Sequence, residues 1–149
     1  MDAVTRRQLG VCYFPEHWDP ADWPADAAEM RALGIDFVRI GEFSWGVTEP
    51  EPGITKLDWM QDSLDLLHSH DIKVVLCTPT ATPPKWLVDS MPDMLATDRN
   101  GQLRPFGSRR HYSFAHMGYR REAARITRLV ADRFGTHPAV IGWQTDNEY

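Results

Sequence analysis

The amide and carboxylate side chains of Asn147 and Glu148 come directly after an apolar run that begins at Val140. If that run is a strand, Glu148 is presented at its end, where it could act as a general acid/base. Glycoside hydrolysis uses two carboxyl groups across the scissile bond, one of them an acid with a raised pKa. Trp143 and Tyr149 could shape the surroundings of such an acid. A glutamate at a strand end can equally cap or form a salt bridge, so position alone leaves both roles open.

Polar and aromatic side chains also follow three earlier apolar runs. They fall in residues 15–18, 42–45 and 78–86, which include Glu16, Glu42 and a tryptophan in each segment. Carboxylates hydrogen-bond sugar hydroxyls, and aromatic faces pack on the C–H surfaces of pyranose rings. The pattern therefore favours a carbohydrate as the ligand.

Hydrophobic patterning predicts the strands that would carry these segments. Short apolar and β-branched runs predict strands over residues 9–14, 36–40, 73–77 and 139–145. Each of the four polar segments then follows the carboxyl end of a strand. If the strands are parallel, these segments come together at one edge of the sheet.

Apolar residues at helical spacing predict three helices between the strands. They span residues 22–34, 57–67 and 119–135. Asp22 is expected to cap the first helix, and a glycine ends the first and third in the usual C-terminal position. Prolines and glycines predict a loop over residues 41–55, and a short helix over residues 84–89 interrupts the long connection that follows the third strand.

Strands that alternate with helices predict parallel pairing and right-handed crossovers. Two α/β architectures fit this order: an open doubly wound sheet, and part of a (β/α)8 barrel. No G-x-G-x-x-G or P-loop motif follows an expected strand, which removes the main support for a nucleotide-binding open sheet. A complete barrel takes about 250 residues. We therefore expect residues 1–149 to form one domain, the first half of a TIM barrel in the order β-α-β-α-β-α-β.

Composition argues against two classes of partner. The net charge is -5, which gives no electrostatic footprint for nucleic acid. No apolar run approaches the roughly 18 residues of a membrane helix, and residues 1–7 lack the apolar core of a signal peptide. We therefore expect a cytoplasmic protein without nucleic-acid or membrane partners. Cys12 and Cys77 lie in expected strands and are predicted to be buried free thiols.

Motifs in order along the chain resemble the N-terminal part of a glycoside hydrolase family 42 β-galactosidase. They are GVCYFPEHW (10–18), RIGEFSW (39–45), TPTATPPKWL (78–87), GSRRHY (107–112) and WQTDNEY (143–149). The resemblance implies a retaining exo-β-galactosidase that removes terminal non-reducing β-D-galactosyl residues. It implies Glu148 as the proton donor, Asn147 and Arg109 as substrate-binding residues, and a β-galactoside substrate without a cofactor. It also implies that full-length relatives are homo-oligomeric.

Arg109 has two interpretations. A buried guanidinium can donate several fixed hydrogen bonds to sugar hydroxyls. Alternatively, Arg109 pairs with a carboxylate such as Glu42 or Glu16 and shapes the pocket, or it does both.

Other candidate residues carry less weight. His17 and His111 could touch a substrate, but a histidine near a strand end is more often structural. The tryptophans Trp18, Trp45 and Trp86 either line a sugar subsite or pack beneath loops. Asp146 points away from the pocket if strand alternation continues, which predicts a structural role.

A metal is not expected. Some members of the resembled family hold zinc through cysteines, the first of which follows the Arg-Arg-His-Tyr segment. Here Ser113 stands at that position. A hydroxyl is a poor zinc ligand beside thiolate, so we predict no zinc there.

The expected catalytic pair is incomplete within these 149 residues. A retaining mechanism needs a second carboxylate about 5–5.5 Å from the first, which the resembled family places later, on the seventh strand. We expect a fragment that is inactive alone. The alternatives are a non-catalytic sugar-binding half-barrel, two copies that assemble into a full barrel, or an unrelated α/β domain that binds a nucleotide or metabolite.

Overall fold

The computed structural model describes residues 7–148. Residues 1–6 and Tyr149 lie outside the described part. The expectation that Tyr149 shapes the surroundings of Glu148 therefore lies outside the described residues, as does most of the segment 1–7 considered for a signal peptide. The described chain forms one sheet of four parallel strands in the order β1-β2-β3-β4. Their bounds are Gly10–Cys12, Phe37–Ile40, Lys73–Cys77 and Val140–Gln144.

The three expected long helices are confirmed. They are α1 (Trp23–Ala32), α3 (Asp58–Ser69) and α5 (Met117–Phe134). Shorter pieces are α2 (Trp45–Thr48) and α4 (Lys85–Ser90), with the 3₁₀ turns η1 (Pro15–His17), η2 (Pro79–Ala81) and η3 (Pro92–Met94). The short helix α4 was expected. Helix α2 corrects the expectation of an unbroken loop over residues 41–55, because a four-residue helix is too short to show a periodic apolar face.

Helix ends were predicted only in part. Gly34 follows α1 with a φ of 82°, the left-handed conformation that a glycine adopts without steric cost. Asp22 occupies the N-cap position of α1, but its side chain makes no capping hydrogen bond because its backbone is already helical, with φ -87° and ψ -22°. The expected cap is therefore wrong. Helix α5 is capped by His116, whose side chain accepts from the backbone N–H of Tyr119 at 3.1 Å.

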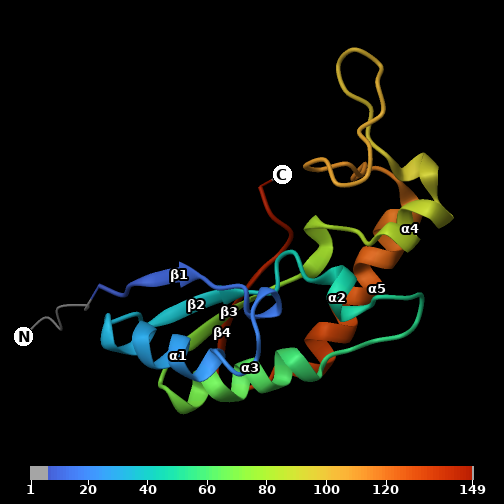
Figure 1. The fold of residues 1–149 in the computed structure, drawn as a ribbon. Coiled ribbons are helices and arrows are strands. Elements are labelled where there is room, and N and C mark those ends of the chain that lie inside the picture. The colour runs from blue at the N-terminus through green and yellow to red at the C-terminus, as the bar shows by residue number, and fades with distance from the viewer. Residues whose placement is uncertain (1–6, 149) are drawn as a thin grey trace, which may run out of the picture.

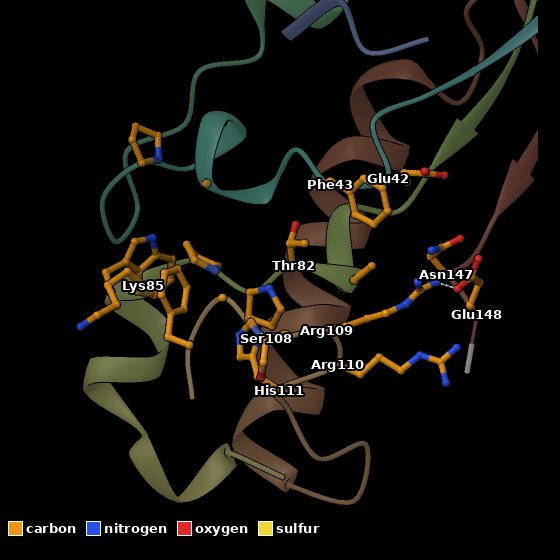
Figure 2. A pocket seen from close by; sticks show the side chains of 18 of the residues that line it. Glu42, Phe43, Thr82, Lys85, Ser108, Arg109, Arg110, His111, Asn147 and Glu148 are labelled. Carbon is orange, nitrogen blue, oxygen red and sulfur yellow. Dashed lines mark hydrogen bonds and ion pairs between the residues drawn. The ribbon is translucent and has the colours of Figure 1, made fainter. Parts of the chain in front are cut away.

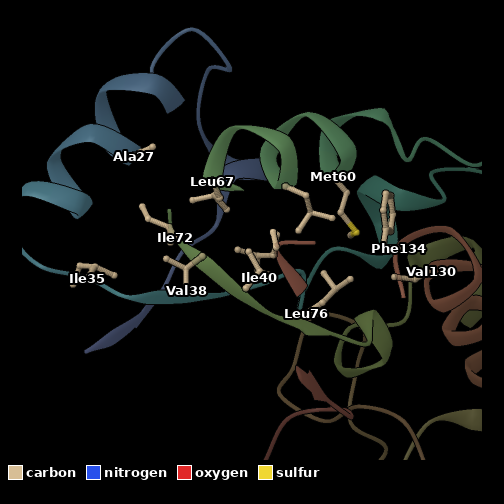
Figure 3. Packing of buried hydrophobic residues seen from close by; sticks show 13 residues of the cluster. Ala27, Ile35, Val38, Ile40, Met60, Leu67, Ile72, Leu76, Val130 and Phe134 are labelled. Carbon is tan, nitrogen blue, oxygen red and sulfur yellow. The ribbon is translucent and has the colours of Figure 1, made fainter. Parts of the chain in front are cut away.

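The main core lies between the sheet and the helices. Alternate strand residues Val38, Ile40, Val74 and Leu76 are fully buried, and they pack with residues of α1, α3 and α5 such as Met60. Figure 3 shows Val38, Ile40 and Leu76 on the face of the sheet that the helices cover. The period of two in burial along β2 and β3 follows from the opposite directions of successive side chains in a strand.

Sequential strand order decides between the two expected architectures. A doubly wound sheet reverses direction at a switch point, whereas a barrel adds each strand beside the last. Here each strand pairs with its predecessor, and the connections all cross on the same face, as Figure 1 shows for α1 and α3. The strands β1 and β4 form the two edges of the described sheet. The order is that of half a (β/α)8 barrel.

One cysteine prediction is wrong. Cys77 in the central strand β3 is buried, but Cys12 in the edge strand β1 is exposed. An edge strand has a neighbour on one side only, so apolar composition does not ensure burial there. Both thiols are free.

Candidate active site

A pocket of about 790 Å³ opens at the carboxyl ends of the strands. Glu42 and Phe43 enter it from the segment after β2, Arg109 from the loop before α5, and Glu148 from the segment after β4. The lining residues are Arg39, Glu42, Phe43, Gly46, Pro50, Ala81, Thr82, Pro83, Pro84, Lys85, Trp86, Phe106, Gly107, Ser108, Arg109, Arg110, His111, Asn147 and Glu148. All three site residues expected from the sequence therefore lie in one cavity, although nearly forty positions separate Arg109 from Asn147.

Arg109 and Glu148 form an ion pair across this pocket. Figure 2 shows the Arg109 side chain reaching from its loop to Asn147 and Glu148. The expected alternative partners were Glu42 and Glu16, but Glu42 is paired with Arg39, with Nη2 and Oε2 2.5 Å apart. The expectation of a buried guanidinium is also wrong. The Arg109 side chain is 69% exposed and that of Glu148 57% exposed, because the described chain covers them from one side only.

The loop that carries Arg109 is held by its own backbone and by a second arginine. The Ser108 hydroxyl donates to Pro105 O at 2.7 Å, and Arg104 Nη1 donates to Arg109 O at 3.3 Å. Gly107 takes a φ of 86° and Arg110 a φ of 52°. These bonds direct the chain so that Arg109 extends over the strand ends.

Asp146 anchors the segment after β4. Its carboxylate accepts hydrogen bonds from Thr80 Oγ1 at 2.8 Å and from the hydroxyl of Tyr112 at 3.0 Å, and its backbone N–H donates to Thr78 Oγ1 at 2.8 Å. Asp146 is not among the residues that line the pocket. The side chain thus points away from the pocket, as alternation predicted, and the anchor turns Asn147 and Glu148 toward it.

The backbone around the site adopts a conformation that side chains disfavour. Among the described residues other than glycine, Asp71, Arg110, Asp146 and Glu148 have positive φ, and the last two take 56° and 52°. Such conformations cost free energy and persist where surrounding contacts hold them, which is common at functional sites. Three of the four lie in the two segments that bring Arg109 and Glu148 together.

Two residues of the site were missed from the sequence. Arg39 Nη1 donates to Gln144 Oε1 at 2.8 Å, and Gln144 Nε2 donates to Asn147 Oδ1 at 3.2 Å. Both lie within strands, on the face opposite the helices. A charged residue inside the apolar run 37–40 was the available signal, since strand alternation places Arg39 opposite the buried Val38 and Ile40.

The expected tryptophans have different surroundings. Trp45 is fully buried, and its indole N–H donates to Glu49 Oε2 at 3.1 Å. Trp86 lines the pocket and donates to Glu49 O at 2.9 Å. Trp18 is 61% exposed and does not line the pocket. Only Trp86 is therefore placed to contact a ligand here.

The two histidines also differ. His111 lines the pocket, is buried, and has Nδ1 3.0 Å from Ser108 O. His17 stacks on Phe14 with ring centroids 5.6 Å apart and does not line the pocket. His111 thus stabilises the loop of Arg109, whereas His17 packs beside β1.

Two buried carboxyl groups lie near the strand ends. Burial raises the pKa of Glu42, and the Arg39 guanidinium acts in the opposite direction. Burial also raises the pKa of Glu16, whose two carboxylate oxygens are buried without a hydrogen-bond partner among the described residues. Both environments disfavour the ionised form. Glu148 differs from both because its side chain is 57% exposed.

Residues 7–148 contain no cluster of three or more His, Cys, Asp or Glu side chains placed to hold a metal ion. Ser113, at the position compared with a zinc-binding cysteine, donates its backbone N–H to Met94 O at 2.8 Å. No helix in the same range is long and apolar enough to span a membrane.

A sheet of sequential parallel strands with acid, amide and guanidinium groups at its carboxyl edge defines part of a (β/α)8 barrel. Residues 12–149 match the family described as β-galactosidase, glycoside hydrolase family 42. The β-galactosidase BgaA of Thermus sp. is 55% identical over 141 residues, which are 95% of this chain and 22% of that protein. The chain therefore belongs to glycoside hydrolase family 42.

Solved structures agree with this assignment. The β-galactosidase of the psychrophilic Marinomonas ef1 matches with a TM-score of 0.94 and 58% identity over 96% of this chain and 22% of that one. The β-galactosidase of Halorubrum lacusprofundi matches with a TM-score of 0.92 and 51% identity over 96% of this chain and 21% of that one. These neighbours are TIM-barrel enzymes, which confirms the predicted half-barrel. The chain spans about a fifth of the length of the relatives it matches.

Proposed function

We propose that this chain is the N-terminal half of the catalytic barrel of a retaining exo-β-galactosidase, with Glu148 as its general acid/base. The observation that carries the proposal is the convergence of Arg109, Asn147 and Glu148 on one pocket at the strand ends. The family membership of the chain and the β-galactosidase activity named for its relatives support the substrate class.

The roles follow from the chemistry of each group. Glu148 donates a proton to the oxygen of the leaving group and later accepts one from the attacking water. As the donor it must carry a proton, and it then no longer pairs with Arg109 as a carboxylate. Arg109 is thereby available to hydrogen-bond sugar hydroxyls, together with the amide of Asn147. The pocket thus combines an acid with donors that hold the galactosyl ring beside it.

The nucleophile of this mechanism comes from outside these 149 residues. Glu42 lines the pocket, but it is buried and bound to Arg39, and burial raises its pKa. A nucleophilic carboxylate must be ionised and accessible to the sugar. The chain alone is therefore expected not to hydrolyse galactosides.

A sugar-binding protein without turnover is the second candidate. It is favoured by the same pocket, since Arg109 and Asn147 supply binding groups without a second accessible carboxylate in the described part. Galactose binding without hydrolysis, in both the short and a longer form, would identify this function.

The test compares the 149-residue chain with a joined protein. The joined protein carries residues 1–149 followed by the downstream part of the Marinomonas ef1 relative. We expect the joined protein to hydrolyse a nitrophenyl β-galactoside and the 149-residue chain not to hydrolyse it. Glu148→Gln should lower kcat/KM by about 10²- to 10⁴-fold, the usual contribution of general acid–base catalysis. Unchanged activity in Glu148→Gln, or hydrolysis by the chain alone, would contradict the proposal.

Two further measurements separate the assigned roles. Arg109→Lys in the joined protein should lower kcat/KM by about 10- to 100-fold, because an ammonium lacks the planar donor fork of a guanidinium. Arg99→Lys, in an exposed turn, is the matched control and should leave activity unchanged. The anomer released first, followed by NMR, should have the β configuration. Initial release of the α anomer would exclude the retaining mechanism.

A further inference from the structure

A chain of polar contacts crosses the inner face of the sheet from β2 to the end of β4. Glu42 Oε2 lies 2.5 Å from Arg39 Nη2, and Arg39 Nη1 donates to Gln144 Oε1 at 2.8 Å. Gln144 Nε2 then donates to Asn147 Oδ1 at 3.2 Å and to Asp146 O at 3.0 Å. The contacts connect a buried carboxylate to the amide beside Glu148.

The polarity of this chain has only one solution. A guanidinium can only donate, so the amide of Gln144 must present its oxygen to Arg39. A backbone carbonyl can only accept, so the same amide must present its NH₂ to Asp146 O. Both ends thus require one orientation of Gln144. The second hydrogen of the Gln144 NH₂ group then needs an acceptor, and this acceptor is Oδ1 of Asn147.

The consequence falls on Asn147, which lines the pocket. The bond from Gln144 orients Oδ1 of Asn147 toward Gln144, so its NH₂ lies on the opposite side of the amide and is available to a ligand as a donor. A free asparagine could present either its oxygen or its NH₂ to a sugar hydroxyl. We propose that Gln144 is a positioning residue that fixes Asn147 as a hydrogen-bond donor to one hydroxyl of the galactosyl ring. This inference rests on the proposed function for the identity of the ligand.

Glu42 and Arg39 hold the far end of the chain. The buried Glu42 side chain holds the guanidinium of Arg39, whose side chain is 29% exposed, against the sheet. Arg39 therefore stands at a fixed place opposite Gln144. The positioning of Asn147 thus depends on contacts between two strands that are not neighbours in the sheet.

The variant that tests the inference is Gln144→Glu in the joined protein. A carboxylate at this position keeps the shape of the side chain and still accepts from Arg39, but it cannot donate to Asn147 or to Asp146 O. Asn147 should then rotate its NH₂ toward the carboxylate and its oxygen toward the sugar. We expect kcat/KM to fall by about 10- to 100-fold, as for loss of a hydrogen bond in a polar site. Gln102→Glu, an exposed residue with the same chemical change, should have no effect.

A double-mutant cycle distinguishes positioning from a simple charge effect. If Gln144 acts through Asn147, Gln144→Glu should change kcat/KM by less than about twofold in an Asn147→Ala background, since contacting residues are non-additive. An equal loss in both backgrounds would overturn the inference, because a new charge near Glu148 acts whether or not Asn147 is present. Gln144→Met provides a neutral variant if the glutamate fails to fold, and it should show the same dependence on Asn147.

Monodeoxy galactosides give a readout that a merely structural role would not change. For the one substrate that lacks the hydroxyl bound by Asn147, Gln144→Glu and Asn147→Ala should both lose their effect. Calorimetric binding of the corresponding monodeoxy galactoses gives the same comparison without turnover. If the joined protein is active but the losses caused by Gln144→Glu and Asn147→Ala are additive, only the positioning role is refuted. If the joined protein binds the monodeoxy galactoses in the expected pattern but hydrolyses no galactoside, only the proposed function is refuted.

Discussion

Asp146 and Glu148 are two positions apart and have opposite surroundings. The Asp146 carboxylate accepts from Thr80, Tyr112 and, at 3.4 Å, from Tyr119. Burial raises the pKa of both tyrosines, so their hydroxyls stay protonated and remain donors. Glu148 has only the solvent-exposed Arg109 as its ion-pair partner among the described residues. Asp146 is therefore held within the protein, whereas Glu148 is exposed at the pocket, where the proposed acid/base role requires it.

The anchoring role of Asp146 predicts a stability effect. Asparagine tolerates the positive φ found at position 146, so Asp146→Asn keeps the backbone conformation. The substitution removes the negative charge to which the hydroxyls of Thr80 and Tyr112 donate hydrogen bonds. We expect the free energy of unfolding to fall by about 1–3 kcal/mol, as for hydrogen bonds to a charged group. Urea unfolding of the joined protein, followed by circular dichroism, measures this change. Asp71→Asn is the control, because Asp71 has a φ of 57° in an exposed turn. Equal midpoints for both variants would contradict the anchor.

At the scale of elements, the position of a strand in the sheet decides how far its residues are covered. The central strand β3 is paired on both sides, whereas β1 and β4 are each paired on one side only. Cys77 at the end of β3 is accordingly buried, and Cys12 at the end of β1 is exposed. Burial raises the pKa of the Cys77 thiol to about 12 from an ordinary value of 9.0.

This difference predicts how the two thiols react. In the 149-residue chain, kept folded at low temperature and low concentration, a maleimide reagent should label Cys12 within minutes and Cys77 only after unfolding. The reactive thiolate is both inaccessible and disfavoured at Cys77. Mass spectrometry of tryptic peptides identifies the labelled site. Cys12→Ser should abolish fast labelling, and rapid modification of Cys77 in the folded chain would contradict the burial.

The raised pKa of Cys77 also makes the stability of the fold depend on pH. The fold favours the neutral thiol, so this contribution to stability is full below the unfolded pKa of about 9 and is lost as the pH rises toward about 12. Cys77→Ala should therefore weaken the fall of stability over that alkaline range.

At the scale of the whole molecule, the sheet leaves apolar residues uncovered at one edge. Ile141 and Trp143 on β4 are 54% and 38% exposed. An unpaired apolar edge strand is a template for association with other chains. In the related barrels the residues matched by this chain are about a fifth of the protein. The remaining strands of such a barrel would cover this edge.

The isolated 149-residue chain is therefore expected to be poorly stable and prone to associate. Thermal denaturation and light scattering after gel filtration measure both properties. Ile141→Lys should increase the monomeric fraction, because a charge on an edge strand opposes pairing. Lys73→Arg, which leaves the edge unchanged, is the control. A sharp cooperative transition from a monomeric wild-type chain would count against the prediction.

The sequence by itself determined most of the elements and named three candidate site residues that share one pocket. Periodicity identified all four strands and the three long helices, because these features depend on nearby residues. The apolar run placed Asn147 and Glu148 at the end of an expected strand, and the resemblance to family 42 implied their roles. Local patterns also predicted that Asp146 faces away from the pocket.

Only the tertiary structure decided which residues meet. Arg109 was expected to bind substrate or, alternatively, to pair with a carboxylate such as Glu42 or Glu16, and its ion-pair partner is Glu148. The contact of Arg39 with Gln144 spans 105 positions. Such contacts depend on strand register and on the path of a long loop, which no local pattern encodes. The exposure of Cys12 has the same origin, since a strand's composition does not say whether it lies at an edge. Residue types therefore specified the chemistry available, and the packing of distant segments decided how it is arranged.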